Sequence, residues 1–270
     1  MTRRRKPSNR YNSRHTLLEA RLITRHCKKY ILKTMNENPI FSEKLWEWRS
    51  FSKSFHKSLV NTIQELPVKF DRPTKMTDNY VWTPDCNLNI KLREQDLKIK
   101  ELISFKPCYL DKTSGDTNYV EQWTAEVYSF PIPMRLMKRI GMELGISNIS
   151  KSLPLVEDKD HFIELLQSQS NSVRVLSIFK QREQRLLPID ESIKGDYKKE
   201  LGDLGTVEIS HLASPENVST LSIEHANIDK VITAVSMMMR NVDKKIYRGM
   251  VFMNYLQAVK VWGLGKKIFD

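Results

Sequence analysis

Hydrophobic and polar residues alternate most regularly near the middle of the chain. Residues 87–93 (NLNIKLR) and 97–100 (LKIK) place Leu or Ile at every second position, with Asn, Lys or Arg between them. This period of two predicts neighbouring strands that are buried on one face only. Lys91, Arg93, Lys98 and Lys100 then share the polar face, where like charges repel one another. The pattern is typical either of an exposed face with solvated lysines or of a basic surface, or barrel interior, that holds phosphates.

The rest of the chain shows strand and helix patterns in an order typical of an α+β fold. Helical spacing of apolar residues predicts helices, and alternation predicts strands. Strands are expected at residues 46–51, 79–83, 119–130, 173–182, 206–211 and 220–225, and helices at 16–35, 52–66, 134–144, 158–167 and 227–241. We expect an antiparallel barrel or tunnel with flanking helices, preceded by a basic arm that is disordered and then helical.

The net charge of +12 is concentrated at the start of the chain. Residues 1–33 hold eleven Lys or Arg and a single acid, Glu19, whereas the rest is nearly balanced, with 33 bases and 31 acids. We therefore divide the chain into a basic arm at residues 1–40 and a folded domain at residues 41–270. The arm is interpreted as an RNA- or polyanion-binding segment, as a transit peptide, or as a solvated extension that docks on the domain.

Cysteine, histidine and hydropathy patterns exclude several classes of protein. The three cysteines and six histidines show no paired or metal-ligand spacing, which argues against a disulfide framework and a structural zinc site. No apolar run approaches the roughly 18 residues that a membrane-spanning helix needs. We expect a protein of a reducing compartment, cytoplasmic, or organellar if residues 1–33 are a transit peptide. The oligomeric state is left open.

Charged residues on the polar faces of the predicted strands form a candidate site. Glu47, Glu208 and Glu224 lie on the first and last strands, which meet if the sheet closes. Converging carboxylates beside cations are suited to holding Mg²⁺ or Mn²⁺ against a phosphate chain, because hard cations prefer oxygen ligands. The three glutamates are therefore the candidate catalytic and metal-binding residues. The expected phosphate-binding residues are Arg49, Lys91, Arg93, Lys100, Arg174, Lys180 and Arg182.

The order of these short motifs resembles the CYTH or triphosphate tunnel metalloenzyme superfamily, most closely a poorly characterised bacterial CYTH-like branch. The resemblance covers residues 45–264. It rests on Glu47-Trp48-Arg49, Asn89-Ile90-Lys91-Leu92-Arg93, Ile99-Lys100, Glu121-Gln122-Trp123, Phe130-Pro131-x-Pro133, Lys180-x-Arg182, Glu208, Ile223-Glu224 and Asn254-Tyr255. It implies a tunnel of eight antiparallel strands that acts on triphosphates, or cyclises ATP, with a divalent metal.

The chain departs from the superfamily pattern at three positions. Leu45 replaces the first glutamate of the usual Glu-x-Glu-x-Lys, Ser222 replaces the first of the closing Glu-x-Glu, and Lys98 stands where the branch usually has an acid. The leading expectation is binding and hydrolysis of a triphosphate compound or polyphosphate, as a metal-dependent phosphohydrolase. A non-catalytic binder of nucleotide, polyphosphate or RNA is the alternative, which the missing carboxylates favour, and a nucleotidyl cyclase is a further one.

Overall fold

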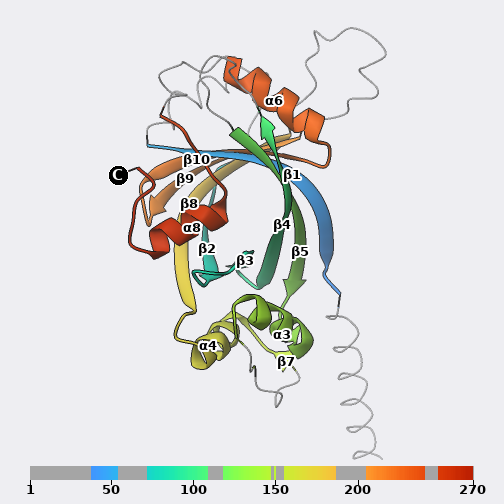
Figure 1. Ribbon diagram of the computed structural model, residues 1–270, viewed down its shortest axis with the longest axis vertical. Coiled ribbons are helices and arrows are strands. Elements are labelled where there is room, and N and C mark those ends of the chain that lie inside the picture. Colours follow the sequence, from blue (N-terminus) through green and yellow to red (C-terminus); the bar gives the residue numbers. More distant parts are fainter. Residues whose placement is uncertain are drawn as a thin grey trace, which may run out of the picture.

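The chain folds around a closed antiparallel barrel of eight strands with flanking helices, as the α+β prediction expected (Figure 1). The computed structural model describes residues 38–53, 72–108, 118–146, 149, 155–186, 205–240 and 249–269. The strands follow the order β10-β9-β8-β2-β3-β4-β5-β1, and pairing of β1 with β10 closes the ring. The two-residue strand β11 pairs with Ser50 and Phe51 near the C-terminal end of β1.

Every strand of the barrel is antiparallel to its neighbours. The barrel strands are β1 (Phe41–Ser52), β2 (Thr74–Trp82), β3 (Leu88–Arg93), β4 (Asp96–Cys108), β5 (Asn118–Ser129), β8 (Arg174–Leu186), β9 (Thr206–Ser214) and β10 (Val218–His225). The described helices are α3 (Met134–Glu143), α4 (Lys159–Gln169), α6 (Ile228–Arg240) and α8 (Tyr255–Gly263). The short strands are β6 (Ile132–Pro133), β7 (Leu155–Val156) and β11 (Val251–Phe252).

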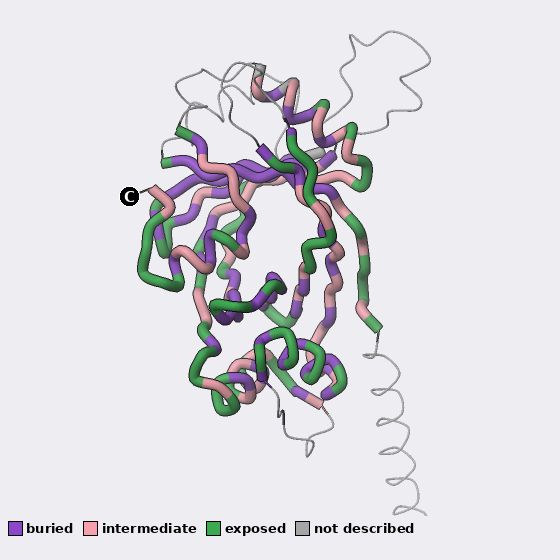
Figure 2. Tube along the Cα trace, in the orientation of Figure 1, coloured by how far each residue is buried: buried purple, intermediate pink, exposed green. Residues whose placement is uncertain are grey.

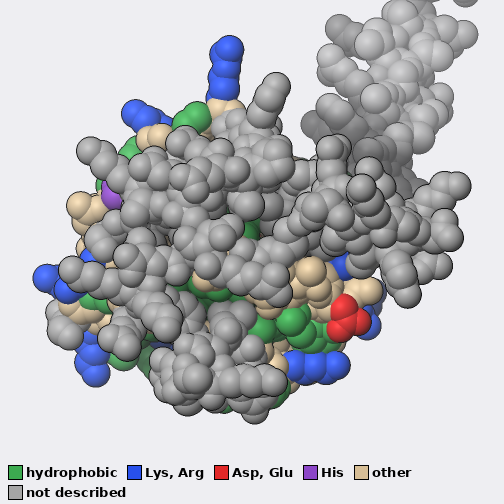
Figure 3. Space-filling view, turned by 90° about the horizontal axis from the view of Figure 1, so that it is seen from above, with side chains coloured by type: hydrophobic (Ala, Val, Ile, Leu, Met, Phe, Trp, Pro, Cys, Tyr) green, Lys and Arg blue, Asp and Glu red, His purple; other side chains and the backbone are tan. Residues whose placement is uncertain are grey.

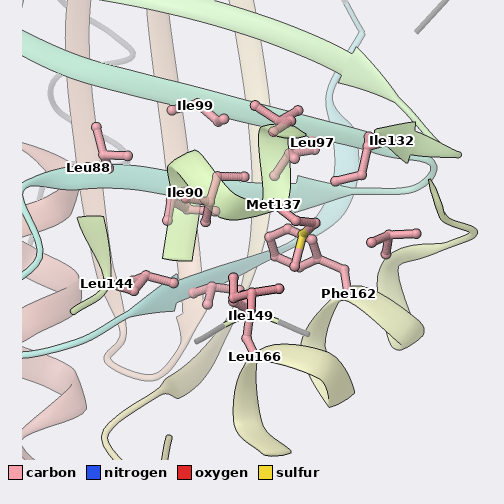
Figure 4. Packing of buried hydrophobic residues seen from close by; sticks show 14 of the residues in the cluster. Leu88, Ile90, Leu97, Ile99, Ile132, Met137, Leu144, Ile149, Phe162 and Leu166 are labelled. Atoms are coloured by element: carbon pink, nitrogen blue, oxygen red, sulfur yellow. The ribbon is translucent and has the colours of Figure 1, made fainter. Parts of the chain in front are cut away.

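The side-chain period of two sorts each strand into an inner polar face and an outer apolar face. On β3 the polar residues face the interior, while Leu88, Ile90 and Leu92 join an outer core together with α3 and α4. Figure 4 shows Leu88 and Ile90 in the same core as Met137 of α3 and Phe162 of α4. The packing stabilises one register, because a slip by one residue would turn the apolar face into the barrel.

A second apolar core lies where α6 covers β1, β9 and β10. Trp46 and Trp48 on β1 and Leu221 and Ile223 on β10 form this core with the apolar face of α6. Residues 46–52 of β1 and 218–223 of β10 are therefore buried on both faces, and Figure 2 shows buried stretches in this part of the barrel. This fixes the register in which Glu47 stands opposite Glu224 on the inner face.

The C-terminal helix α8 packs into one end of the barrel rather than on its outside. Its apolar face contacts the inward-facing Phe51, Tyr80 and Trp82, which form a third core. The contact is close, because a Cβ atom at Gly263 would lie 1.8 Å from the Trp82 ring. Trp262 anchors the helix by donating a hydrogen bond from its indole nitrogen to Glu216 (2.8 Å). The barrel interior is therefore apolar at this end.

Most predicted elements are present, often with longer bounds. β4 extends to Cys108, and the strand predicted at 206–211 extends to Ser214. The helix predicted at 52–66 does not begin at residue 52, which belongs to β1, and its remainder lies almost entirely outside the described residues. The arm and the helix expected at 16–35 also lie outside them. Within the described part of the chain, no helix is long and apolar enough to cross a membrane.

Candidate functional site

The inner faces of the strands line a polar cavity of about 120 Å³. Seven cationic side chains and three carboxylates are among the residues that line it. The cations are Arg49, Lys91, Arg93, Lys98, Lys100, Lys180 and Arg182, and the carboxylates are Glu47, Glu208 and Glu224. By contrast, the described Lys and Arg side chains on the face shown in Figure 3 stand apart from one another at the periphery.

Nine of the ten residues predicted for the site line this cavity, and Arg174 does not. Arg174 lies at the start of β8 opposite Trp82 and is exposed. It shares the face of Lys180 and Arg182, but it lies six residues before Lys180, which corresponds to roughly 20 Å along a strand. The intervening inward-facing residues, Leu176 and Ile178, pack in the core around α8. The phosphate-binding role predicted for Arg174 therefore has no support from its position.

Glu47 and Glu224 face each other across the β1–β10 ladder, and Lys100 lies between them. The ammonium of Lys100 is 2.8 Å from Glu47 Oε2 and 3.2 Å from Glu224 Oε1. The guanidinium of Arg49 donates to Glu47 Oε1 at 2.6 Å and lies 4.0 Å from Glu224. Two carboxylates directly opposite each other are destabilising unless a cation separates them. Lys100 fills that role in the free protein.

A second network surrounds Asp78, a carboxylate that the sequence analysis missed. Asp78 is fully buried on β2 and accepts two hydrogen bonds from Arg93, at 2.6 and 2.8 Å. The ammonium of Lys180 lies 3.3 Å from Asp78 Oδ2, and that of Lys91 lies 3.8 Å from it. The strand prediction at 79–83 began five residues too late, because β2 starts at Thr74. Thr77, Asp78 and Asn79 are all polar, so no alternation of apolar and polar residues was present to extend the prediction.

Glu208 belongs to a third network on β8 and β9. Its carboxylate lies 3.5 Å from the ammonium of Lys180 and 3.8 Å from the guanidinium of Arg182. It also accepts hydrogen bonds from Gln184 (3.2 Å) and from the Ser210 hydroxyl (3.0 Å). Lys180 thus lies between Asp78 and Glu208, and it links the second and third networks.

The cations keep these carboxylates ionised. Burial alone would raise the pKa of Glu47, but Lys100 and Arg49 outweigh burial and hold that pKa well below its usual range. Burial is likewise outweighed at Asp78, by Arg93 and Lys91, and at Glu208, by Lys180 and Arg49, so both pKa values are lowered. The carboxylates therefore carry full negative charge at neutral pH.

The surroundings of Lys91, by contrast, disfavour its charged form. Burial lowers the pKa of Lys91 well below its usual value, and the neighbouring Arg93 and Lys180 lower it further, whereas Asp78 opposes the shift. Burial and Lys100 similarly lower the pKa of Lys98. The seven lining cations exceed the three lining carboxylates and Asp78 by three charges when all are ionised. A bound anion would relieve this excess.

Carboxylates also follow one another across three strands, since Glu47 pairs with Glu224 on β10 and with Glu121 on β5. Glu121 accepts a hydrogen bond from Asn254 at 2.9 Å. Burial raises the pKa of Glu121. Among the residues that the structure describes, no group of three or more Asp, Glu, His or Cys is arranged to hold a metal ion. Mg²⁺ is usually bound by one or two carboxylates plus substrate phosphates, so Glu47 and Glu224 would need a phosphate ligand to complete such a site.

No family model and no curated protein matches the sequence. Several solved structures are similar in fold. A protein from Hippeastrum, described as a putative adenylyl cyclase with dominant triphosphatase activity, matches with a TM-score of 0.45 and 11% identity, over 84% of this chain and 98% of its own. The PH1012 protein of Pyrococcus horikoshii matches with a TM-score of 0.39 and 13% identity, over 74% and 93%.

A chain of the Schizosaccharomyces pombe Mediator head module also matches, with a TM-score of 0.35 and 9% identity, over 78% of this chain and 98% of its own. These three structures belong to proteins that are described in different ways. Identities of 9 to 13% assign no function. The residues of the cavity must therefore indicate what the barrel binds.

Proposed function

We propose that the barrel binds a triphosphate-containing compound or a polyphosphate in its central cavity. The observation that carries this proposal is that seven cations line one cavity and outnumber the three lining carboxylates and Asp78. Burying so many like charges is costly unless counter-charges accompany them. A phosphate chain supplies several negative charges and many acceptor oxygens, and thus fits this lining better than a neutral ligand does.

The arrangement of the cations favours a chain of phosphates over a single phosphate. Arg49 and Lys100 lie on one side, with Glu47 and Glu224. Lys91 and Lys180 lie with Asp78 in the second network. A ligand with several phosphoryl groups offers enough acceptor oxygens for the cations of both groups. Arginine forms paired hydrogen bonds with phosphate oxygens, while lysine acts as a compact point charge.

Metal-dependent hydrolysis of that ligand is a second step of the proposal, and the pair of Glu47 and Glu224 favours it. These two carboxylates would hold Mg²⁺ or Mn²⁺ if Lys100 moved from them to a phosphate oxygen. A bound divalent ion polarises a phosphoryl oxygen and neutralises developing charge. Arg49, Lys180 and Arg182 would bind and orient the phosphate chain around it. Without this step the barrel is a receptor for the same ligand.

Calorimetry with tripolyphosphate in EDTA tests the binding proposal. The wild-type chain should bind one equivalent, and Lys91→Met should weaken binding by about 10-fold or more, in line with loss of a charge-assisted contact. Lys138→Met is the matched control, because it removes the same charge from an exposed position on α3. Absence of binding by the wild type, or equal loss in both variants, would refute the proposal.

Phosphate release separates the enzyme from the receptor. Wild-type protein is incubated with tripolyphosphate and a panel of nucleoside triphosphates, in Mg²⁺ or Mn²⁺ and again in EDTA. Glu224→Gln should lower metal-dependent turnover about 100-fold, since it removes a charged metal ligand. Triphosphate affinity in EDTA should hold or rise, because a negative charge leaves the cavity. Binding without turnover in any metal would leave the receptor as the function.

A further inference from the structure

Tyr255 lines the cavity but belongs to none of the three ionic networks. It is the first residue of α8, directly after Asn254, whose side chain and backbone form a capping box with Gln257. This cap fixes the start of the helix and therefore the place where the tyrosine enters the barrel. The side chain is 6% exposed.

The Tyr255 ring is held on several sides. It stacks on Tyr80, with centroids 5.7 Å apart, and meets Phe51 edge to face at 5.6 Å. The guanidinium of Arg49 lies over the ring at 4.3 Å from its centroid, and the ammonium of Lys180 lies at 5.0 Å. Contacts of this kind fix the plane of the ring. An anion bound to Arg49 and Lys180 would therefore lie close to Tyr255.

The hydroxyl of Tyr255 is buried and has no hydrogen-bond partner among the described residues. Among the neighbouring side-chain hydroxyls, those of Thr220 and Ser210 pair with Arg49 and Glu208 respectively, whereas that of Ser222 is also buried without a hydrogen-bond partner among the described residues. A buried hydroxyl without a partner is unfavourable, and in native structures such a group requires an explanation. A ligand that brings an acceptor oxygen into the cavity would supply one.

We propose that the Tyr255 hydroxyl donates a hydrogen bond to a phosphoryl oxygen of the bound ligand, at the position where Arg49 and Lys180 hold that phosphoryl group. This inference rests on the proposed binding function and adds a neutral, rigidly held donor to the cationic lining. Because the ring is fixed before the ligand enters, little side-chain freedom is lost on binding. Helix α8 is then part of the binding site as well as a wall of the barrel.

The test compares Tyr255→Phe with the wild type by tripolyphosphate calorimetry in EDTA and by thermal unfolding without ligand. The variant keeps the ring and removes only the hydroxyl, so affinity should fall by about 10-fold or more. Its melting temperature should stay the same or rise, since the hydroxyl has no partner to lose in the free protein. Tyr128→Phe is the matched control, because Tyr128 lies outside the barrel and its hydroxyl bonds Glu126 at 2.9 Å. It should leave affinity unchanged and lower stability slightly.

The possible results distinguish failure of the Tyr255 inference from failure of the proposed function. If the wild type binds and Tyr255→Phe binds equally well, the role of the hydroxyl is wrong while the proposed function stands. If Tyr255→Phe unfolds at a lower temperature and loses affinity only in proportion to its unfolded fraction, the hydroxyl is structural and the inference is overturned. If the wild type itself does not bind tripolyphosphate, the proposed function fails and this inference fails with it.

Discussion

Replacing Asp78 by Asn should destabilise the barrel more than any other conservative change of a single carboxylate. The amide preserves the shape but removes the negative charge from between Arg93, Lys91 and Lys180. Asp78 is fully buried, and the Lys180 side chain is only 3% exposed. Removing one partner of a buried ion pair costs about 3–5 kcal/mol. Since Arg93 and Lys91 are partly exposed and solvent screens them, we expect about 3 kcal/mol.

Thermal unfolding measures this loss. For a folded domain of this size, 1 kcal/mol corresponds to about 2–4 °C, so the melting temperature should fall by about 6–12 °C at pH 7. Asp85→Asn is the control, because it makes the same chemical change at an exposed residue in the turn after β2. If Asp78→Asn melts within about 2 °C of the wild type, the three cations do not depend on Asp78 as a counter-charge.

The pH dependence supplies a second readout of the same variant. The folded state lowers the pKa of Asp78, so its stabilising contribution is complete above the unfolded pKa of about 3.9 and is lost as the pH falls below it. The wild type and Asp78→Asn should therefore differ most near neutral pH and converge in acid. A difference that shrinks already well above pH 3.9, or that stays constant well below it, would contradict this reasoning.

Three more predictions follow from the charges. The melting temperature of Lys91→Met should be no lower than that of the wild type at pH 7, because the folded state lowers the pKa of Lys91 and so disfavours its charged form. Any gain in stability should disappear as the pH rises toward 10.4, and a clear loss of stability at pH 7 would contradict the prediction. Arg182→Met should weaken tripolyphosphate binding about 10-fold and Arg174→Met should not, and equal losses would refute the placement of the site. Deleting residues 1–33 should remove most salt-dependent RNA binding, and an unchanged salt slope would assign that binding to the barrel.

Strand parity made much of the site predictable. The alternation at 87–93 and 97–100 correctly separated the inner cations from the leucines and isoleucines that pack on α3 and α4. Glu47 and Glu224 lie on the first and last predicted strands, which meet if the sheet closes. In the structure the two residues are direct partners. Both signals are local periodicities combined with closure of the sheet.

Depth along the barrel was not predictable in the same way. Parity assigns a face but not a distance along the strand, which is why Arg174 was grouped with Lys180 although the α8 core lies between them. Helix α8 was not expected at all, and neither was the part that Tyr255 takes in the cavity. Its place inside the barrel depends on tertiary contacts such as the close approach of Gly263 to Trp82, which have no signature in a single sequence.

A crystal structure of the full chain with tripolyphosphate in EDTA tests the central claim most directly. The account predicts phosphoryl groups inside the barrel, with oxygens in contact with Arg49, Lys91 and Lys180 and one oxygen within hydrogen-bond distance of the Tyr255 hydroxyl. Tripolyphosphate bound only outside the barrel, with the ionic pairs of Asp78 and Glu47 unchanged inside, would contradict it.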